Sequence, residues 1–230
     1  MKSLAIITAR GGSKRIPRKN IKLFVGFPII KYSIDAALQA RCFDEVMVST
    51  DDRKIAQISE KCGAKVPFIR SETTSNDFAT TADVIEEVLL EYQKRGTYFD
   101  DFCCVYPTAP FITGNRLAEA MKILHETGVD AVLPVTRFSY PIQRALKIEN
   151  GSVSMIWPEN YRARSQDLMP AFHDCGQFYC LKSSYLLEKK NMFAENSRAI
   201  EIPESEVQDI DTEEDWKLAE LKFKLLRGAI

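Results

Sequence analysis

The sequence predicts an α/β fold in which a doubly wound, mostly parallel sheet is covered by helices on both faces. Short runs rich in Ile, Val and Leu alternate along the chain with segments whose apolar residues recur at helical spacing. The connections between these segments are short, as in right-handed βαβ units. The 230 residues suffice for one domain with a substantial core, so we expect a single domain over residues 1–230.

Apolar runs without alternation mark the expected strands of the first half. Such runs are typical of parallel strands that are buried on both faces of a sheet. We expect strands at Leu4–Ile7, Glu45–Thr50, Phe102–Tyr106 and Val129–Val135, and a further strand or extended segment at Val66–Arg70.

Helices are expected between these strands, because apolar residues recur there with a period close to 3.6. The expected helices begin at Pro28, cover residues 55–62, run from Thr80 or Thr81 to about Arg95, and cover residues 117–124. Gly63, Gly96 and Gly128 follow the last three helices. Glycine is favoured at that place because it adopts the left-handed conformation that ends many helices.

The alternation of strands and helices stops at about residues 137–172. Three prolines and many polar residues occur there, and Ser152–Trp157 alternates polar and apolar side chains. A period of two is typical of a half-exposed strand, so we interpret the stretch as an insertion that bears a β-hairpin. Tyr140, Ile156 and Trp157 would form an exposed apolar patch on it, which suggests a partner surface. The alternative is a β-ribbon that folds back on its own domain.

The pattern of strands and helices resumes after the insertion. We expect a strand at Gln177–Leu181, a short helix at Ser184–Lys189 and a last strand at Ala199–Ile202. Residues 212–215 have the form of a capping box, in which a threonine and an acidic residue three positions later satisfy each other's backbone groups. The capping box predicts a final helix, with an apolar face made of Trp216, Ala219, Phe223 and Leu226.

The composition argues against several classes of protein. The net charge is −1, so the chain lacks the basic character of a protein that binds nucleic acid. Two histidines, and six cysteines without a C-x-x-C pair, disfavour a zinc site. No stretch approaches the roughly 20 apolar residues of a membrane-spanning helix, and no secretory leader is recognisable. We therefore expect a cytoplasmic protein that binds neither nucleic acid nor membrane.

The most informative segment is Ala9–Asn20, which directly follows the first expected strand. Gly11 and Gly12 allow a tight turn that exposes backbone N–H groups. Five cations surround them, namely Arg10, Lys14, Arg15, Arg18 and Lys19. A loop of this kind suits the phosphates of a nucleotide, and a solvated basic turn is the alternative. It has neither the spacing of a P-loop nor the G-x-G-x-x-G of a dinucleotide fold, which argues against an ATPase and a nicotinamide dehydrogenase.

Two acidic pairs occur in the chain. Asp209 and Asp211 flank one isoleucine, so in an extended segment both carboxylates face the same side. Two such oxygen ligands suit Mg²⁺, which completes its octahedron with water and phosphate oxygens. The alternative is that Asp211 caps the last helix and Asp209 is a solvated surface acid. Asp51 and Asp52 are adjacent and cannot both face one ligand, so we expect a turn or a helix N-cap there.

Residues 9–20, ARGGSKRIPRKN, resemble the N-terminal signature of the sugar-acid cytidylyltransferases, a family that includes the CMP-sialic acid synthetases. The resemblance extends from Leu4 to about Leu226 and implies a Rossmann-like nucleotidyltransferase that binds CTP on this loop. The nucleotide-binding residues that it implies are Ala9, Arg10, Gly11, Gly12, Lys19, Asn20, Thr80 and Tyr106. The implied catalytic residues are Arg10, Lys14, Lys19 and Asp211, and the implied ligands of the Mg²⁺ cofactor are Asp209 and Asp211.

One position departs from the pattern of the family. Residues 106–110, YPTAP, match a Q-P-T-S-P stretch of the CMP-sialic acid synthetases, in which the glutamine contacts the cytosine. Tyr106 replaces that glutamine, and it either stacks on the base or simply packs. Other groups are then needed to read the cytosine, such as backbone amides near Ala9 and side chains near Thr80 and Thr81.

A third stretch resembles the part of the family that faces the sugar acid. It comprises R-S-Q-D-L at residues 164–168 and FHDCGQFY at residues 172–179, of which the latter resembles the subgroup that activates pseudaminic acid. Cys175 stands where sialic acid synthetases usually have asparagine. The implied substrate-binding residues are Arg164, Gln166, Asp167, His173, Asp174 and Gln177. His173 is either a base whose imidazole is steadied by a carboxylate or a structural histidine.

The resemblance implies the transfer of CMP from CTP to a nonulosonic sugar acid, foremost pseudaminic acid, with release of pyrophosphate. It also implies a homodimer, because in the family the insertion is an arm that docks onto a second subunit. Sialic acid, legionaminic acid or a different alcohol are alternative acceptors. A nucleotide-binding regulator without activity is a further alternative, against which the intact Asp209 and Asp211 count.

Overall fold

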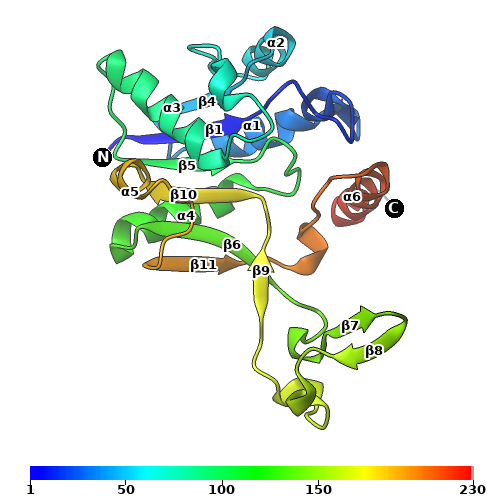
Figure 1. Cartoon of the computed structure of the whole chain (residues 1–230). Coiled ribbons are helices and arrows are strands. Elements are labelled where there is room, and N and C mark those ends of the chain that lie inside the picture. The colour runs from blue at the N-terminus through cyan, green and yellow to red at the C-terminus, as the bar shows by residue number, and fades with distance from the viewer. Residues whose placement is uncertain (229–230) are drawn as a thin grey trace.

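The fold is built on a seven-stranded sheet (Figure 1). The structure is a computed structural model that describes residues 1–228. The strands of the sheet are β1 (Ser3–Thr8), β4 (Glu45–Ser49), β5 (Asp101–Val105), β6 (Ala131–Arg137), β9 (Phe172–Asp174), β10 (Phe178–Lys182) and β11 (Ser197–Glu201). Their order is β11-β6-β10-β5-β1-β4, and β9 pairs with β6. The α/β class predicted from the sequence is confirmed.

One central strand runs against its neighbours. β1, β4, β5, β6 and β11 share one direction, so the sheet is mainly parallel as predicted, whereas β10 is antiparallel to both β5 and β6. The path of the chain explains this. After β6 the chain leaves the sheet, returns as β9 along the end of β6, and then enters between β5 and β6. Because it enters from the carboxyl edge, β10 must run in the opposite direction.

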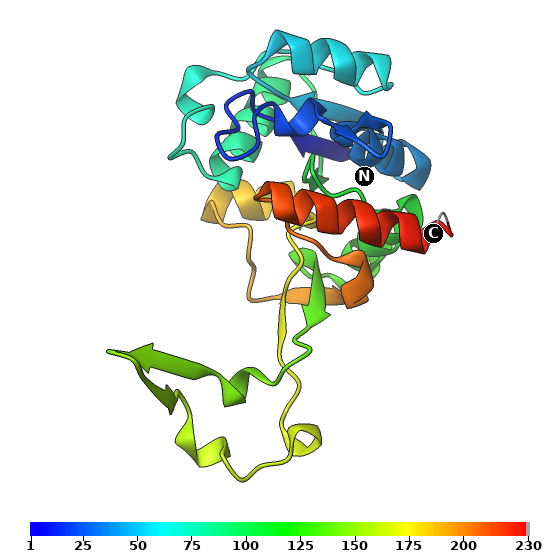
Figure 2. The same cartoon turned by 90° about the vertical axis from the view of Figure 1, so that its right-hand side faces the viewer.

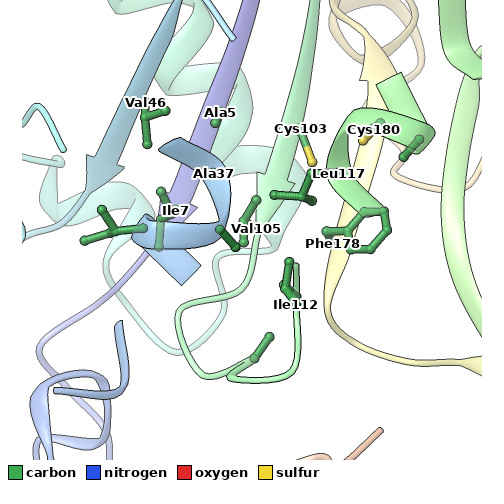
Figure 3. Close-up of a cluster of buried hydrophobic side chains, with 14 of the residues drawn as sticks. Ala5, Ile7, Ala37, Val46, Cys103, Val105, Ile112, Leu117, Phe178 and Cys180 are labelled. Atoms are coloured by element: carbon green, nitrogen blue, oxygen red, sulfur yellow. The ribbon is translucent and has the colours of Figure 1, made fainter. Parts of the chain in front are cut away.

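Helices cover both faces of the sheet, as a doubly wound fold requires. The helices of the described residues are α1 (Ile29–Ala40), α2 (Arg53–Lys61), α3 (Thr81–Lys94), α4 (Gly114–Thr127), α5 (Ser183–Lys189) and α6 (Glu213–Leu226). Successive strand residues point to opposite faces. Ala5 and Ile7 therefore pack in a cluster with Ala37 of α1 and Leu117 of α4, shown in Figure 3. Leu4 and Ile6, which point to the other face, pack in a second cluster with α3 and α5.

None of the helices in residues 1–228 combines the length and the apolar character needed to cross a membrane. The segment Val66–Arg70 is extended and forms no strand of its own. Lys65, just before it, forms an isolated bridge with Met47 of β4, and the Arg70 side chain at its end donates to Ser49 of β4.

A small hairpin that the sequence did not predict fixes the position of the last helix. It consists of β2 (Leu23–Phe24) and β3 (Phe27–Pro28). The ring of Phe24 packs edge-on against Trp216 and Phe223 of α6, with centroids 5.6 Å and 5.4 Å away. This third cluster therefore ties the C-terminal helix, and the segment that precedes it, to the N-terminal part of the chain.

The insertion projects from the body as an arm, which both views show (Figures 1 and 2). Its hairpin consists of β7 (Leu146–Glu149) and β8 (Ser152–Met155), so the predicted hairpin is present. Asn150 and Gly151 between these strands have φ values of 50° and 80°, as a two-residue hairpin turn of type I′ requires. The alternative, a ribbon folded back on its own domain, is not what the single chain adopts.

Candidate active site

The loop of residues 9–20 meets segment 209–211 near the carboxyl end of β1. The Lys19 ammonium donates to the Ile210 carbonyl oxygen at 2.6 Å and lies 3.5 Å from Asp211 Oδ1. The Arg15 guanidinium lies 2.7 Å from Asp211 Oδ2. A cavity of about 420 Å³ lies along the loop. Its lining includes Arg10, Lys14, Arg15, Lys19, Thr81 and Tyr106. The two clusters of charge that the sequence indicated are therefore in contact.

The loop is anchored from inside, unlike a solvated turn. The Ala9 amide donates to the Ser49 carbonyl oxygen at 2.9 Å, and the side-chain amide of Asn20 donates to the Arg10 carbonyl oxygen at 2.8 Å. The Ile16 side chain is only 1% exposed and belongs to the cluster that holds α6. Anchors at the beginning, middle and end of the loop keep its cations in defined positions.

The two glycines of the loop have different surroundings. The Gly11 amide donates to Asp51 Oδ1 at 2.8 Å, so it is already engaged. A Cβ at Gly11 would lie 3.0 Å from Cβ and Oδ2 of Asp52, which explains why a glycine is needed there. Gly12 is exposed and its amide has no hydrogen-bond partner within residues 1–228. Of the two amides that the sequence offered as donors, that of Gly12 is the one open to a ligand.

Carboxylates pair with the cations of the loop. Asp77 binds Arg10 at 2.9 Å and also pairs with Lys14, and these hydrogen bonds lower the pKa of Asp77. Asp52 caps α2 by accepting from the backbone of its first turn, as one of the sequence alternatives proposed. Arg18 pairs with Asp52, and its hydrogen bond lowers the pKa of that carboxyl. Arg18 is thereby turned toward α2, and it is absent from the cavity lining.

Two side chains of the cavity wall come from α3 and from the end of β5. The Thr80 hydroxyl is used in a capping box with Asp83, and it is the neighbouring Thr81 that lines the cavity. The Thr81 hydroxyl lies 3.2 Å from the Tyr106 hydroxyl. Tyr106 also packs against the ring of Tyr179, with centroids 5.5 Å apart, and burial raises its pKa. Tyr106 therefore enters the cavity as a neutral, hydrogen-bonding aromatic.

Arg70 is a charged residue near this site that the sequence analysis did not single out. Its side chain is 6% exposed and donates to the hydroxyl and the carbonyl oxygen of Ser49, at 3.0 Å and 2.5 Å. No carboxylate within the described residues forms an ion pair with it, and burial lowers the pKa of its guanidinium. The local sequence carries no signal of this burial, which is unusual for an arginine and follows from its contacts with β4.

The donor set at Asp209 and Asp211 fits a magnesium ion. Asp209 is exposed, and partial desolvation together with the nearby charge of Asp211 raises the pKa of its carboxyl. No lysine or arginine within residues 1–228 forms an ion pair with the Asp209 carboxyl, which borders a cavity, so it is open to a bound cation. No group of three acidic, histidine or cysteine ligands exists in the described part of the chain. Two carboxylates suit Mg²⁺ nevertheless, because this ion usually takes one or two carboxylates and completes its shell with water and phosphate.

A second cavity, of about 390 Å³, is bordered by Asp209. It is lined by His173, Asp174, Gly176, Asp209 and Lys222, among others. Asp174 accepts from the Gly176 amide at 3.0 Å and from the Tyr179 hydroxyl. Both of its oxygens are thereby fixed while the carboxylate borders the cavity. Lys222 of α6, which the sequence analysis missed, donates to the Val207 carbonyl oxygen at 2.8 Å.

The remaining residues predicted to bind the sugar lie elsewhere in the single chain. Arg164 and Asp167 form an ion pair of 2.8 Å on the exposed arm. Gln166 lines a further cavity of about 430 Å³ between the arm and the sheet. Gln177 is buried and donates to the Glu206 carbonyl oxygen at 2.7 Å, while its own amide oxygen has no partner in the described residues. Only His173 and Asp174 of this set share a cavity with Asp209.

Comparison with known proteins gives relatives over the whole chain. The family model described as cytidylyltransferase matches residues 4–151. A pseudaminic acid cytidylyltransferase of Campylobacter jejuni is 42% identical over 98% of this chain and 97% of its own length. A CMP-N,N'-diacetyllegionaminic acid synthase of Legionella pneumophila is 32% identical, with both chains covered completely.

The solved structures agree with these relatives in fold. The structure of a CMP:2-keto-3-deoxy-manno-octonic acid synthetase complexed with CTP superposes with a TM-score of 0.71. It covers 99% of this chain and 100% of its own, at 18% identity. At that level of identity the likeness concerns the fold alone. The family model and the relatives together show that the chain belongs to the cytidylyltransferase family.

Proposed function

We propose that the protein transfers CMP from CTP to a nonulosonic sugar acid, with pseudaminic acid as the preferred acceptor. The observation that carries the proposal is the contact of Lys19 and Arg15 with Ile210 and Asp211. Such a contact supports a site in which cations and hard oxygen ligands act together on one triphosphate. The named activities of the relatives support the class of acceptor.

In the proposed complex the triphosphate lies along the basic loop. Arg10, Lys14 and Lys19 neutralise phosphate oxygens, and the Gly12 amide donates to one of them. During phosphoryl transfer, negative charge grows on the equatorial and leaving oxygens, and fixed donors stabilise it. The hydrogen bond from Asn20 to the Arg10 carbonyl oxygen keeps the loop in shape before the substrate arrives, so that little reorganisation accompanies the reaction.

The proposed reaction exchanges one phosphorus–oxygen bond for another, and the proton of the anomeric hydroxyl is released to solvent. The anomeric oxygen of the sugar acid attacks the α-phosphorus, and the bond from that phosphorus to the bridging oxygen breaks, so pyrophosphate leaves. We place the acceptor in the second cavity. Asp174, held by Gly176 and Tyr179, accepts hydrogen bonds from sugar hydroxyls there, and His173 lies beside it. Holding both reactants in one geometry contributes through proximity.

Mg²⁺ is the proposed cofactor, and Asp209 and Asp211 are its proposed ligands. When bound, it would offset charge on the nucleotide and make the acceptor hydroxyl more acidic. Asp211 has a second task in the chain itself, because it holds Lys19 and Arg15 at the rim of the cavity. The dependence on Mg²⁺ also separates an enzyme from an inactive nucleotide-binding regulator, since only the former needs the ion for turnover.

We propose a homodimer in the cytoplasm, in which the arm docks onto the second subunit. The arm carries many exposed apolar side chains, among them Tyr140, Leu146, Ile148, Val153, Ile156 and Tyr161. A patch of this kind on a single chain supports a partner surface. All six cysteines are free, which is what a reducing compartment maintains.

The experiment that tests the proposal is incubation of the protein with CTP, Mg²⁺ and a panel of nonulosonic acids, with mass detection of the products. The CMP-sugar of pseudaminic acid is expected to form fastest. A faster reaction with a legionaminic or sialic acid would change the assigned acceptor but keep the proposed reaction. Absence of any CMP-sugar, with CTP bound, would support the inactive regulator instead.

The nucleotide is expected to be selected at the base. The protein should use CTP well and UTP or ATP poorly, because polar groups of the cavity wall such as Thr81 and Tyr106 that pair with one base are left unpaired by another. Pyrophosphate release with each of the four nucleotides measures this. Equal rates with CTP and UTP would contradict the expectation.

A further inference from the structure

One carboxylate outside the nucleotide cavity holds two of the cations that line it. Asp77 Oδ1 accepts from Arg10 Nη1 at 2.9 Å, and Oδ2 pairs with Lys14. Arg10 also donates to the Asn76 carbonyl oxygen at 3.2 Å. Arg10 and Lys14 belong to the cavity wall, whereas Asn76 and Asp77 do not. The carboxylate thus reaches both cations without occupying the space that a nucleotide would fill.

The turn that carries Asp77 is held by its own hydrogen bonds. Asn76 Oδ1 accepts from the amides of Phe78 and Ala79, at 2.8 Å and 3.0 Å. The Asn76 side-chain amide donates to the Thr73 carbonyl oxygen at 2.7 Å. The turn leads directly into the capping box of α3, so its far end is fixed as well. A carboxylate on such a turn has a defined position relative to the sheet.

Stability does not explain this arrangement. The side chains of Arg10 and Asp77 are 39% and 45% exposed, and ion pairs with such exposure contribute little to stability. Positioning explains it better. Two long cationic side chains on one loop repel each other and have many rotamers, and a carboxylate between them reduces the repulsion and restricts both.

We propose that Asp77 is a positioning residue for CMP transfer, which holds the Arg10 guanidinium and the Lys14 ammonium at the separation at which both contact the phosphates of CTP. Asp211 holds Arg15 and Lys19 in the same way on the other flank, so the loop lies between two carboxylates. The inference rests on the proposed function, since it assigns Asp77 a task in the same site.

Asp77→Ala is expected to lower kcat/KM for CTP by about 10- to 100-fold, the scale at which small misplacements of binding groups act. It should weaken CTP binding, measured by calorimetry without an acceptor, and leave the KM of the acceptor and the Tm unchanged. Asp77→Glu should restore part of the loss. Asp77→Asn, which keeps an acceptor without the charge, is the second variant if Asp77→Ala does not fold.

The matched control is Glu91→Ala. Glu91 also pairs with one lysine and one arginine, Lys94 and Arg95, each at 2.7 Å. It lies near the other end of α3, away from the cavity, so its loss should change neither CTP binding nor turnover. An equal loss in both variants would assign the effect to general electrostatics and overturn the inference.

A double-mutant cycle makes the test specific. When Arg10 and Lys14 are already replaced by alanine, Asp77→Ala should cause no further loss, because its partners are gone. Unchanged kcat/KM, tighter CTP binding, or a full additional loss in that background would each overturn the inference. A wild-type protein that binds CTP but transfers CMP to no acceptor would contradict the proposed function alone, since the binding titration still decides the role of Asp77.

Discussion

The five cations of the basic loop have unequal surroundings, although the sequence presents them as one cluster. Arg18 pairs with the carboxylate that caps α2 and is absent from the cavity wall, whereas the other four line it. Lys19 is the most constrained of the four, because its ammonium is 2.6 Å from a carbonyl oxygen of the segment that carries the aspartates. Lys19 and Arg15 therefore both link the loop to the segment that carries the aspartates.

Lys19→Ala or Asp211→Ala is expected to lower the catalytic rate by about 100-fold or more while leaving the fold intact, a scale seen when one donor to the transition state is lost. Steady-state kinetics with CTP and the acceptor measures the rate, and circular dichroism checks the fold. Glu213→Gln is the control, since Glu213 pairs with Lys22 at 2.6 Å near the same segment. Near-normal turnover of either alanine variant would refute the assignment.

At this scale the sequence reveals which residues carry charge but not which groups are already engaged. The Gly11 amide is bound by Asp51 and the Thr80 hydroxyl caps α3, so that Gly12 keeps the free amide and Thr81 lines the cavity. Which of two neighbouring groups is already hydrogen-bonded depends on the local backbone dihedral angles, and the sequence pattern does not give these. Arg70 was missed because its burial follows from contacts with β4, which the local pattern does not contain.

At the scale of elements, the residue that caps α2 also contacts the basic loop of the candidate site. Asp52 accepts from the amides of Lys54 and Ile55, at 2.8 Å and 2.9 Å, and the same carboxylate holds Arg18 of the basic loop. One side chain thus fixes the start of α2 and the middle of the loop. The hydrogen bonds from Arg18 and from the helix lower the pKa of Asp52 below its ordinary value of 3.8.

Asp52→Asn is expected to lower stability by about 1 kcal/mol or less at neutral pH, because it keeps the cap but loses the ion pair. A lowered folded-state pKa stabilises the fold above 3.8, and this contribution is lost as the pH falls through the folded-state value. The Tm difference between wild type and variant should therefore shrink at low pH. Thermal melts across the acidic range measure it, with Glu60→Gln of the same helix as the control. A difference that does not change with pH would contradict the explanation.

The strands and helices were largely predictable because their signals are local. Apolar runs such as Phe102–Tyr106, and the capping box before α6, carry enough information by themselves. The direction of β10 was not predictable in this way. It depends on where the chain returns from the arm, and the apolar run at residues 177–181 looks the same in either direction.

At the scale of the whole molecule, the arm is the part that the single chain leaves without a packing partner. The side chains of Ile148 and Val153 on its hairpin are 73% and 60% exposed. Arg164 and Asp167, which the resemblance assigns to the sugar, lie on the same arm and pair with each other there. A complete acceptor site would then require a second subunit, which fits the proposed dimer.

The wild-type protein is expected to sediment as a dimer of two 26.1 kDa chains. Ile148→Asp places a charge in the exposed apolar face of the arm, so it should shift the protein toward single chains and raise the KM of the acceptor. Sedimentation velocity at micromolar concentration measures the shift. Leu225→Asp, at an equally exposed position of α6, should not change the mass. A wild-type protein that sediments as one chain would contradict the dimer.

The place where the arm leaves the sheet has a consequence for how such a protein can evolve. The Phe138 amide donates to the Ala171 carbonyl oxygen at 3.0 Å, so the outgoing and incoming strands touch where they leave the body. The segment between Phe138 and Ala171 therefore leaves the sheet and returns to it at the same place. In the course of evolution this segment can be lengthened, shortened or exchanged without altering the order of the strands, so the arm is free to diverge while the proposed nucleotide site stays the same.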